Sequence, residues 1–490
     1  MSISRRDFLK LTGLVAASSA LASCRPLYEL AGHPHLAQWP PLNPADFRAL
    51  NRLTFGARPG ERARVAEIGL QAWVEEQLAL DSSDDLACAL RLRNLDTLDM
   101  SAQQLFDHSN KLFDDFDIQT IPSQLRQGTL LRQVYSKRQL YEVMVEFWSN
   151  HFNIATDKGA CYYLKTVDDR EVIRSHALGS FHNLLWASAH SPAMLTYLDN
   201  QANHKGAPNE NYARELLELH TLGINGGYTQ ADVMELARCL TGWSVKEHFW
   251  RGEFTFDGEK HDTGEKVVLG AQIRPGGQEE AESVLERLGR HPSTALFITS
   301  KLARRFLADD PPASLIQKAA QAFETSKGEI RAVLRVILLD GLPLAREKYR
   351  RPVNFVTVAL RMLDAESDCG PAIQDYLLRM GQMPFTWPTP DGFPDRSQAW
   401  QGNLLPRWQF ALALSRNELE KTSVNLTALL STSGHENPLD MLASLLFGNL
   451  PSQTERDALL KAIRSAGASD DELLPILASG LLASPAFQWS

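Results

Sequence analysis

Apolar positions recur along most of the chain every three or four residues, which is the spacing of helices that bury one face. Strand-like runs are few: residues 254–256 and 266–269 flank a turn at residues 257–259. We therefore expect an all-α fold, either one large multi-helix domain or two tightly packed helical lobes. A small β-hairpin excursion is expected near residues 252–270, within an insertion of about residues 250–275.

The clearest helix signals set the expected order of elements. Asn43 and Pro44 open a helix that runs towards Leu53, and Thr229 with Asp232 forms a capping box for another. One long helix is expected over about residues 124–152, with others near 168–177, 180–190, 192–198 and 209–223. Residues 384–394 hold four prolines and three aromatic residues, so this stretch is not helical and should pack over other structure.

Residues 209–223 form one predicted amphipathic helix with a histidine on its apolar face. At about 100° per residue, His220 falls beside Leu216 and Leu217, and Glu215 lies at the border of the apolar arc. A buried imidazole needs partners for both ring nitrogens. The pattern fits either a core histidine bonded to a carbonyl and a carboxylate, or a functional group.

The helix that ends near residue 152 repeats this pattern. His151 falls between Leu140 and Met144 on the apolar face, whereas Glu146 falls on the face expected to meet solvent. A spacing of five residues places Glu146 about 140° from His151 on a helix, so the two side chains are not expected to share a site.

The histidines cluster in one region of the chain. Eight of the thirteen lie between residues 151 and 261, where even spacing would place about three. If the two helices face each other, His151 and His220 could bind a metal or transfer protons, with Glu215 as a further acid–base group. His182, on the apolar side of its own helix, is the third candidate metal ligand. A transition metal is the candidate cofactor of this site.

The first residues resemble an export signal rather than part of the fold. Arg5 and Arg6 lie in the twin-arginine form SRRDFLK, followed by an apolar run too short for a permanent membrane helix. The run ends in Leu-Ala-Ser before Cys24, which is similar to a lipobox; an ordinary cleavage site with a chance cysteine is the alternative. We expect a signal peptide over residues 1–23, lipidation of Cys24, a tether over 24–43 and the helical domain over 44–490.

The expected location is the periplasm or the cell envelope, with a lipid anchor in the membrane. Residue 25 is Arg rather than Asp, so nothing indicates retention at the inner membrane. Anchoring in the outer membrane is therefore an open alternative. Twin-arginine export of a folded chain also favours a cofactor inserted before export. A net charge of −9 argues against a nucleic-acid partner, because phosphate binding needs a basic surface.

Cysteine spacing and missing motifs narrow the chemistry further. The cysteines beyond the signal form no C-x-x-C pair, and buried free thiols are expected at Cys88, Cys161, Cys239 and Cys369. The sequence lacks a phosphate-binding glycine loop, a G-x-S-x-G elbow, an H-E-x-x-H motif and a haem-attachment motif. The major hydrolase, kinase and c-type cytochrome classes are therefore unsupported.

Several longer stretches resemble a bacterial family known as domain of unknown function 1800, or DUF1800. The matching stretches are residues 50–57 (LNRLTFGA), 146–152 (EFWSNHF), 192–199 (PAMLTYLD), 209–223, 240–243 (LTGW), 261–262 and 291–292. The resemblance covers most of the chain beyond the signal and implies an exported helical protein. Such proteins are often encoded beside a second exported family that looks like sulfatases and alkaline phosphatases. The resemblance implies no assigned activity and no catalytic residues.

Two functions remain open from the sequence. The first is an envelope lipoprotein with a metal- or cofactor-dependent active site at His151 and His220, acting on an envelope or extracellular substrate. The second is a non-catalytic scaffold that binds a sulfatase-like partner or a polysaccharide, with residues 387–393 as its contact surface. Close approach of the two histidines favours the first function, whereas separate positions with separate carbonyl or carboxylate partners favour the second.

Overall fold

The computed structural model describes residues 40, 42–81, 85–109, 118–248, 251–454, 456–457, 460–461 and 470–490. The predicted export and lipidation residues Arg5, Arg6 and Cys24 lie outside the described residues, as does most of the predicted tether. The fold is mostly helical, at 62%, and the described residues add three small two-stranded antiparallel sheets. The predicted all-α fold class is confirmed.

The first part of the chain, as far as the structure describes it, forms eight helices. Its helices are α3 (Pro44–Leu53), α4 (Pro59–Ile68), α5 (Leu70–Ala79), α6 (Leu86–Leu92), α7 (Ala102–Ser109), α8 (Thr120–Tyr135), α9 (Gln139–His151) and α10 (Cys161–Asp168), with the 3₁₀ turn η3 (Asp96–Asp99). The prediction of one long helix over residues 124–152 is wrong. The chain is extended at Ser136 between α8 and α9, and the Asp85 carboxylate accepts hydrogen bonds there from Ser136 Oγ and the Lys137 amide.

The remaining helices follow in shorter segments. They are α11 (Phe181–Ala189), α12 (Pro192–Tyr197), α13 (Glu210–Glu215), α14 (Gln230–Cys239), α15 (Gln278–Gly289), α16 (Pro292–Phe306), α17 (Ala313–Thr325), α18 (Ile330–Arg335), α19 (Pro352–Met362), α20 (Pro371–Arg379), α21 (Leu405–Ser415), α22 (Leu426–Ser433), α23 (Pro438–Phe447), α25 (Asp470–Ala483) and α26 (Pro485–Gln488). In the part of the chain that the structure describes, three segments are π-helical: η4 (Asp169–Arg174), η6 (Leu216–Thr221) and η7 (Val336–Asp340). The 3₁₀ turns are η5 (Asn200–Ala202), η8 (Leu342–Leu344) and η9 (Ser397–Trp400).

The predicted caps are present at the helix starts. Asn43 Oδ1 accepts the Asp46 amide at 2.9 Å at the start of α3, and Thr229 and Asp232 form the reciprocal capping box of α14.

The strand segments lie where the sequence predicts them, but their pairing differs. β2 (Phe254–Phe256) pairs with β1 (Trp243–Val245), and β3 (Lys266–Val268) pairs with β4 (Ala271–Ile273). The predicted small β excursion is confirmed as two short antiparallel pairs, although the two runs do not pair with each other, because each finds a nearer partner strand. A third pair joins β5 (Glu366–Ser367) to β6 (Thr422–Ser423).

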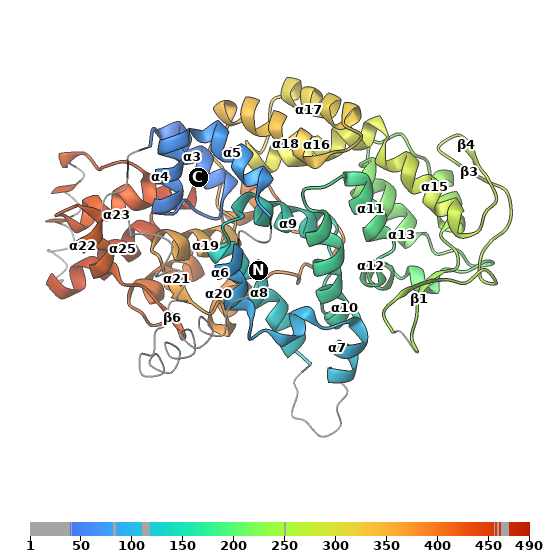
Figure 1. The fold of residues 1–490 in the computed structure, drawn as a ribbon, viewed down its shortest axis with the longest axis horizontal. Coiled ribbons are helices and arrows are strands. Elements are labelled where there is room, and N and C mark those ends of the chain that lie inside the picture. Colours follow the sequence, from blue (N-terminus) through green and yellow to red (C-terminus); the bar gives the residue numbers. More distant parts are fainter. Residues whose placement is uncertain are drawn as a thin grey trace, which may run out of the picture.

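The helices build an elongated body (Figure 1). Helices α22, α23 and α25 lie at one end, and α15 with β3 and β4 lies at the other. Helices α8, α9 and α19 occupy the middle, beneath a layer made by α16, α17 and α18. The C-terminal end of the chain returns to α3, where Arg52 Nη2 donates to the Ser490 main-chain oxygen at 2.6 Å.

Helix α9 is buried on nearly every side, including its polar residues. Glu142 is 3% exposed and accepts from Arg174 Nη1 at 3.0 Å, while Arg174 Nε also donates to Asp169 at 2.7 Å. Glu146 is mostly buried as well and binds Arg351 through two hydrogen bonds of 2.9 Å. The prediction that Glu146 is solvated is wrong, because arginines from other elements neutralise the polar side of α9.

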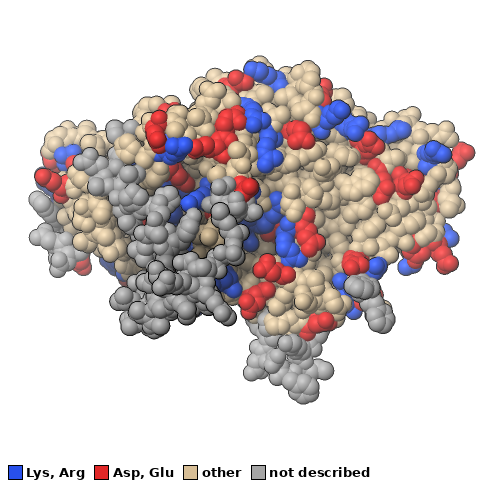
Figure 2. Space-filling view, in the orientation of Figure 1, with Lys and Arg blue, Asp and Glu red and all other residues tan. Residues whose placement is uncertain are grey.

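The cysteines agree with the sequence analysis. Cys88, Cys161, Cys239 and Cys369 are all buried free thiols. Figure 2 shows acidic and basic side chains interspersed over the visible face. Among the described residues, no helix combines the length and apolar character needed to cross a membrane.

The turn between α3 and α4 gives a test of the fold. Gly56 has a φ of 114°, and a Cβ there would lie 2.9 Å from the Val358 Cα. We predict that Gly56→Ala lowers the free energy of unfolding by roughly 1–3 kcal/mol, through backbone strain and this contact. Urea unfolding of the purified protein measures the change.

Gly60→Ala is the matched control, since nothing lies within 4 Å of the added Cβ. Its effect should stay within about 0.5 kcal/mol. Equal losses in the two variants would contradict the packing described at Gly56.

Candidate functional site

His151 is the last residue of α9, and both of its ring nitrogens are used. Nε2 lies 3.1 Å from the His220 carbonyl oxygen, and Nδ1 lies 2.8 Å from Lys301 Nζ. A carbonyl only accepts hydrogen bonds, so Nε2 carries the proton and Nδ1 accepts from the lysine. His151 is 1% exposed, and this pair of bonds fixes its neutral tautomer and its orientation.

His220 lies beside His151 in the π-helical segment η6. The two ring centroids are 6.1 Å apart, and the His220 ring is 5.0 Å from that of Phe152. His220 is 1% exposed, and within the described structure neither ring nitrogen has a hydrogen-bond partner. Buried polar atoms without partners destabilise a fold, and π-helical turns are frequent at functional sites. His220 therefore does not have the bonding of an ordinary core histidine.

Lys301 of α16 completes this group, which we call the Lys–His cluster: His151, His220 and Lys301. Burial lowers the pKa of Lys301 to about 8, although the negative charge of Asp395 opposes the shift. At that pKa, about a tenth of the lysine is a neutral amine near pH 7. Among the described residues, no carboxylate forms an ion pair with Lys301, and its hydrogen bond goes to His151.

The cluster disfavours protonation of its own histidines. Burial and then the Lys301 charge lower the pKa of His220 to about 3. The same two causes lower the pKa of His151 well below its usual value. Both imidazoles are therefore neutral at physiological pH, whereas Lys301 exchanges its proton near that pH.

The aromatic loop at residues 384–395 covers the end of α9. Asn153 Nδ2 donates to the main-chain oxygens of Trp387 at 2.9 Å and Thr389 at 2.8 Å. Asn150 exchanges two hydrogen bonds with the main chain of Phe393, at 2.8 and 2.7 Å. The sequence prediction that this stretch packs over other structure is confirmed, and two asparagines of α9 and its following turn hold it.

The loop also brings carboxylates towards the Lys–His cluster. The negative charges of Asp391 and Asp395 favour the ammonium form of Lys301, which places both near it. Asp391 accepts from Trp387 Nε1 at 3.1 Å, so its carboxylate is oriented by the loop itself. The same Asp391 contributes, after burial and Glu218, to a raised pKa of Glu215.

The predicted site residues are only partly gathered. The structure brings His151 and His220 together, and Glu215 lies half-buried at the end of α13, directly before η6. His182 instead lies where α11 packs on α15, with its ring against Gly289.

The donor set does not form an evident metal centre. Among the described residues, no group of three or more His, Cys, Asp and Glu side chains could hold a metal ion. His151 has no free nitrogen, and an ammonium group lies 2.8 Å from it. The metal role of His151, His220 and His182 stays a prediction, and the geometry favours proton transfer.

The sequence reasoning missed Lys301, although a signal for it was present. At about 100° per residue, Lys301 falls at the border of the buried arc of α16, about 40° from Arg305 and 60° from Ile298. This border position is the one that Glu215 has on its own helix, and it is a weaker signal than the apolar position of His220. Asp391 had no such signal, because its place depends on how the loop lies over α9.

Comparison with known proteins places the chain in a family without giving it a function. The family model described as "Protein of unknown function (DUF1800)" matches residues 48–489. The chain belongs to the DUF1800 family. No curated protein and no solved structure matches it. The family match spans all three members of the Lys–His cluster, and it assigns a role to none of them.

His220 provides the test of this geometry. We predict that His220→Phe lowers the free energy of unfolding by less than about 1 kcal/mol at pH 7.5, because no hydrogen bond is lost and an aromatic ring still fills the space. In the wild type, the pKa of His220 is about 3 in the folded state and about 6.5 in the unfolded state. Between these two pH values, the folded state binds fewer protons than the unfolded state. Stability therefore falls as the pH decreases through this window, and from pH 7.5 to 5.0 His220 accounts for about 2 kcal/mol.

Urea unfolding at both pH values measures this loss in the wild type and in His220→Phe. The variant should lose about 2 kcal/mol less than the wild type on acidification. His204→Phe, at an exposed position, is the control and should retain the wild-type pH dependence. An unchanged pH dependence in His220→Phe would show that His220 does not lie in the buried setting described.

Proposed function

We propose that this DUF1800 protein is an exported, lipid-anchored enzyme in which Lys301 transfers protons to and from a substrate. The observation that carries the proposal is the 2.8 Å hydrogen bond between Lys301 Nζ and His151 Nδ1, in a setting without a carboxylate ion pair to Lys301 among the described residues. A partly buried lysine with a lowered pKa contributes little to stability but is an effective base near neutral pH.

The three residues take different roles. The neutral amine of Lys301 accepts a proton from the substrate, and the ammonium that forms is stabilised by the charges of Asp391 and Asp395. His151 is a positioning residue, because its nitrogens hold the amine on one side and the His220 carbonyl on the other. His220 supplies a second imidazole whose nitrogens are uncommitted within the described structure.

The pattern of partners argues against a purely structural cluster. Replacement of a buried polar group by apolar residues is often neutral or stabilising, so a buried histidine without hydrogen bonds, beside a partly buried lysine without a carboxylate, needs another reason to be there. Such perturbed groups gather at functional sites. A scaffold that binds a sulfatase-like partner or a polysaccharide would use the exposed part of the loop and would leave the cluster without a purpose.

The location rests on the first residues of the chain. The SRRDFLK stretch and Cys24 support twin-arginine export and lipid anchoring in the envelope, where the substrate would be an envelope or extracellular compound. The sulfatase-like exported family implied by the resemblance remains the proposed partner.

The export proposal predicts two separable defects. Arg5→Lys with Arg6→Lys should keep the full-length precursor in the cytoplasm, since the twin-arginine pair is the recognised feature. Cys24→Ser should leave export intact but abolish lipidation, so the protein should move from the membrane to the soluble envelope fraction. Cell fractionation and mass spectrometry of the N-terminus measure both, and normal export of the double lysine variant would contradict the assignment.

The proton-transfer proposal predicts the behaviour of Lys301. Its amine should titrate near pH 8 in competitive labelling with trace acetic anhydride, with the other lysines as internal references. Lys301→Met should abolish turnover in a product screen of the exported protein against envelope polysaccharides, peptidoglycan and small extracellular metabolites. Lys318→Met, at an exposed position, is the matched control.

Two results would contradict this proposal. The first is a Lys301 amine that titrates near its ordinary 10.5. The second is a stoichiometric metal in the natively exported protein that a folded His220→Phe variant loses, since that would make the histidines ligands.

A further inference from the structure

An open pocket separate from the Lys–His cluster lies where α3, α23 and α26 meet. Its volume is about 410 Å³, within the range of small-molecule sites. Its walls are mainly apolar and are formed by Pro44, Phe47, Leu446, Phe447, Pro485, Ala486 and Trp489. The polar residues that line it are Arg48, Asn51, Glu347, Arg350, Asn449 and Ser490, and of these Asn51 and Arg350 are buried.

Within the described structure, Arg350 and its neighbour Arg52 form no ion pair with an Asp or Glu side chain. Arg350 Nη1 donates to the Phe487 carbonyl, and Arg52 Nη2 donates to the carbonyls of Arg346 at 2.5 Å and Ser490 at 2.6 Å. Burial, then the charges of Arg52 and Arg407, lower the pKa of Arg350 to about 9. Arg350 is buried and Arg52 is partly buried, and two guanidinium groups that repel each other in such a setting favour an anion between them.

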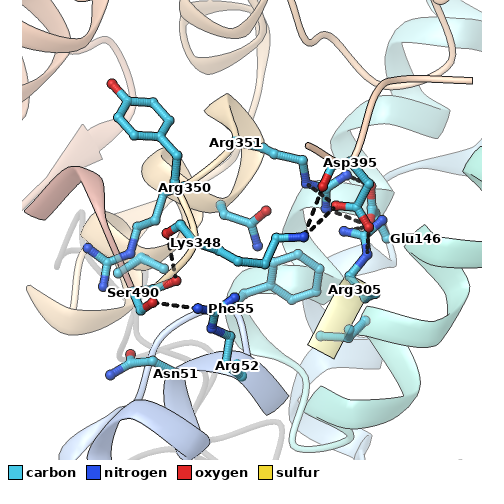
Figure 3. Close-up of a pocket in the computed structure, with 14 residues that line it drawn as sticks. Asn51, Arg52, Phe55, Glu146, Arg305, Lys348, Arg350, Arg351, Asp395 and Ser490 are labelled. Carbon is cyan, nitrogen blue, oxygen red and sulfur yellow. Dashed lines mark hydrogen bonds and ion pairs between the residues drawn. The ribbon is translucent and has the colours of Figure 1, made fainter. Parts of the chain in front are cut away.

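A smaller cavity continues from the pocket into the molecule. It has a volume of about 50 Å³ and shares Asn51, Arg350 and Ser490 with the pocket. Figure 3 shows two groups of side chains in it: Arg52, Arg350 and Ser490 on one side, and a carboxylate–arginine network on the other. In that network Arg305, Arg351 and Lys348 are neutralised by Glu146, Asp395 and Asp309.

The charge balance leaves an excess of cations at the shared end. Five cationic side chains line the smaller cavity: Arg52, Arg305, Lys348, Arg350 and Arg351. Among the described residues, two carboxylate side chains, Glu146 and Asp395, line it with them. Counting the main-chain oxygen of Ser490 as a carboxylate still leaves the cations in excess.

We propose that the pocket binds a small amphiphilic carboxylate. The carboxylate would lie at Arg350, with Arg52 behind it, and the apolar body would pack on Phe47, Phe447 and Trp489. An uncharged apolar ligand would leave the two arginines unpaired, and a small anion would leave the apolar walls in water. Each buried methylene should strengthen binding about fourfold.

Calorimetric titration of the folded protein with octanoate, acetate and 1-octanol at constant ionic strength tests this proposal. Octanoate should bind at least tenfold more tightly than either acetate or octanol, because only octanoate satisfies both ends of the site. Arg350→Gln should weaken octanoate at least tenfold and leave octanol unchanged. Arg335→Gln, at an exposed ion pair with Glu75, is the control and should bind as the wild type does.

A second variant, at another position, tests the proposal even if Arg350→Gln does not fold. Ala486→Trp fills the apolar part of the pocket from an exposed position and should abolish octanoate binding. Equal binding of octanoate and octanol, or full octanoate binding by Ala486→Trp, would overturn the proposal. Lys301→Met should bind octanoate normally, so the result does not depend on the proposed function.

Discussion

The carboxylate of Glu146 ties together the three elements on which the rest of the structure depends. It accepts two hydrogen bonds of 2.9 Å from Arg351, at the start of α19, and pairs with Arg305 of α16 at 2.9 Å. A buried carboxylate between two guanidinium groups is strongly directional, because loss of one partner leaves an unpaired charge. The contact therefore fixes how α9 and α16 lie against each other. His151 follows Glu146 by five residues, and Lys301 precedes Arg305 by four, so the same register sets the distance between the lysine and the histidine.

This ion-pair network also divides the polar interior into two environments. On one side the Lys–His cluster keeps neutral histidines and a lysine that loses its proton easily, because burial outweighs the attraction of Asp391 and Asp395. On the other side the C-terminal segment pairs with the chain before α19, and Arg52 and Arg350 bind its main-chain oxygens. The carboxylates of Glu146 and Asp395 therefore lie between the two environments. The cations on either side, Lys301 and the pair Arg52 and Arg350, hydrogen-bond to uncharged partners instead.

Features that depend on hydrophobic periodicity and on local helix caps could be predicted from the sequence. Helix positions, the cap at Asn43 and the apolar placement of His151 and His220 all follow from spacing of about 3.6 residues per turn. The features that could not be predicted depend on contacts between segments far apart in the sequence. Glu146 was expected in solvent because nothing near it in sequence predicts Arg351, and β2 and β3 were paired with each other because their true partners are equally short and unremarkable. The role of Asn153 was also hidden, since its acceptors lie more than two hundred residues away.

The π-helical segment η6 has a consequence for how this site tolerates change in length. A π turn holds one residue more than the α-helical turn it replaces, and here Leu222 N bonds Leu217 O, five residues back, at 2.9 Å. Loss of any single residue from Leu216–Thr221 would let the segment relax into an ordinary helix. Everything after it would then turn by about 100°, and the His220 carbonyl would no longer meet His151. Single-residue deletions here should therefore be far less acceptable than substitutions, so natural variation in this segment is expected to preserve its length more strictly than its composition.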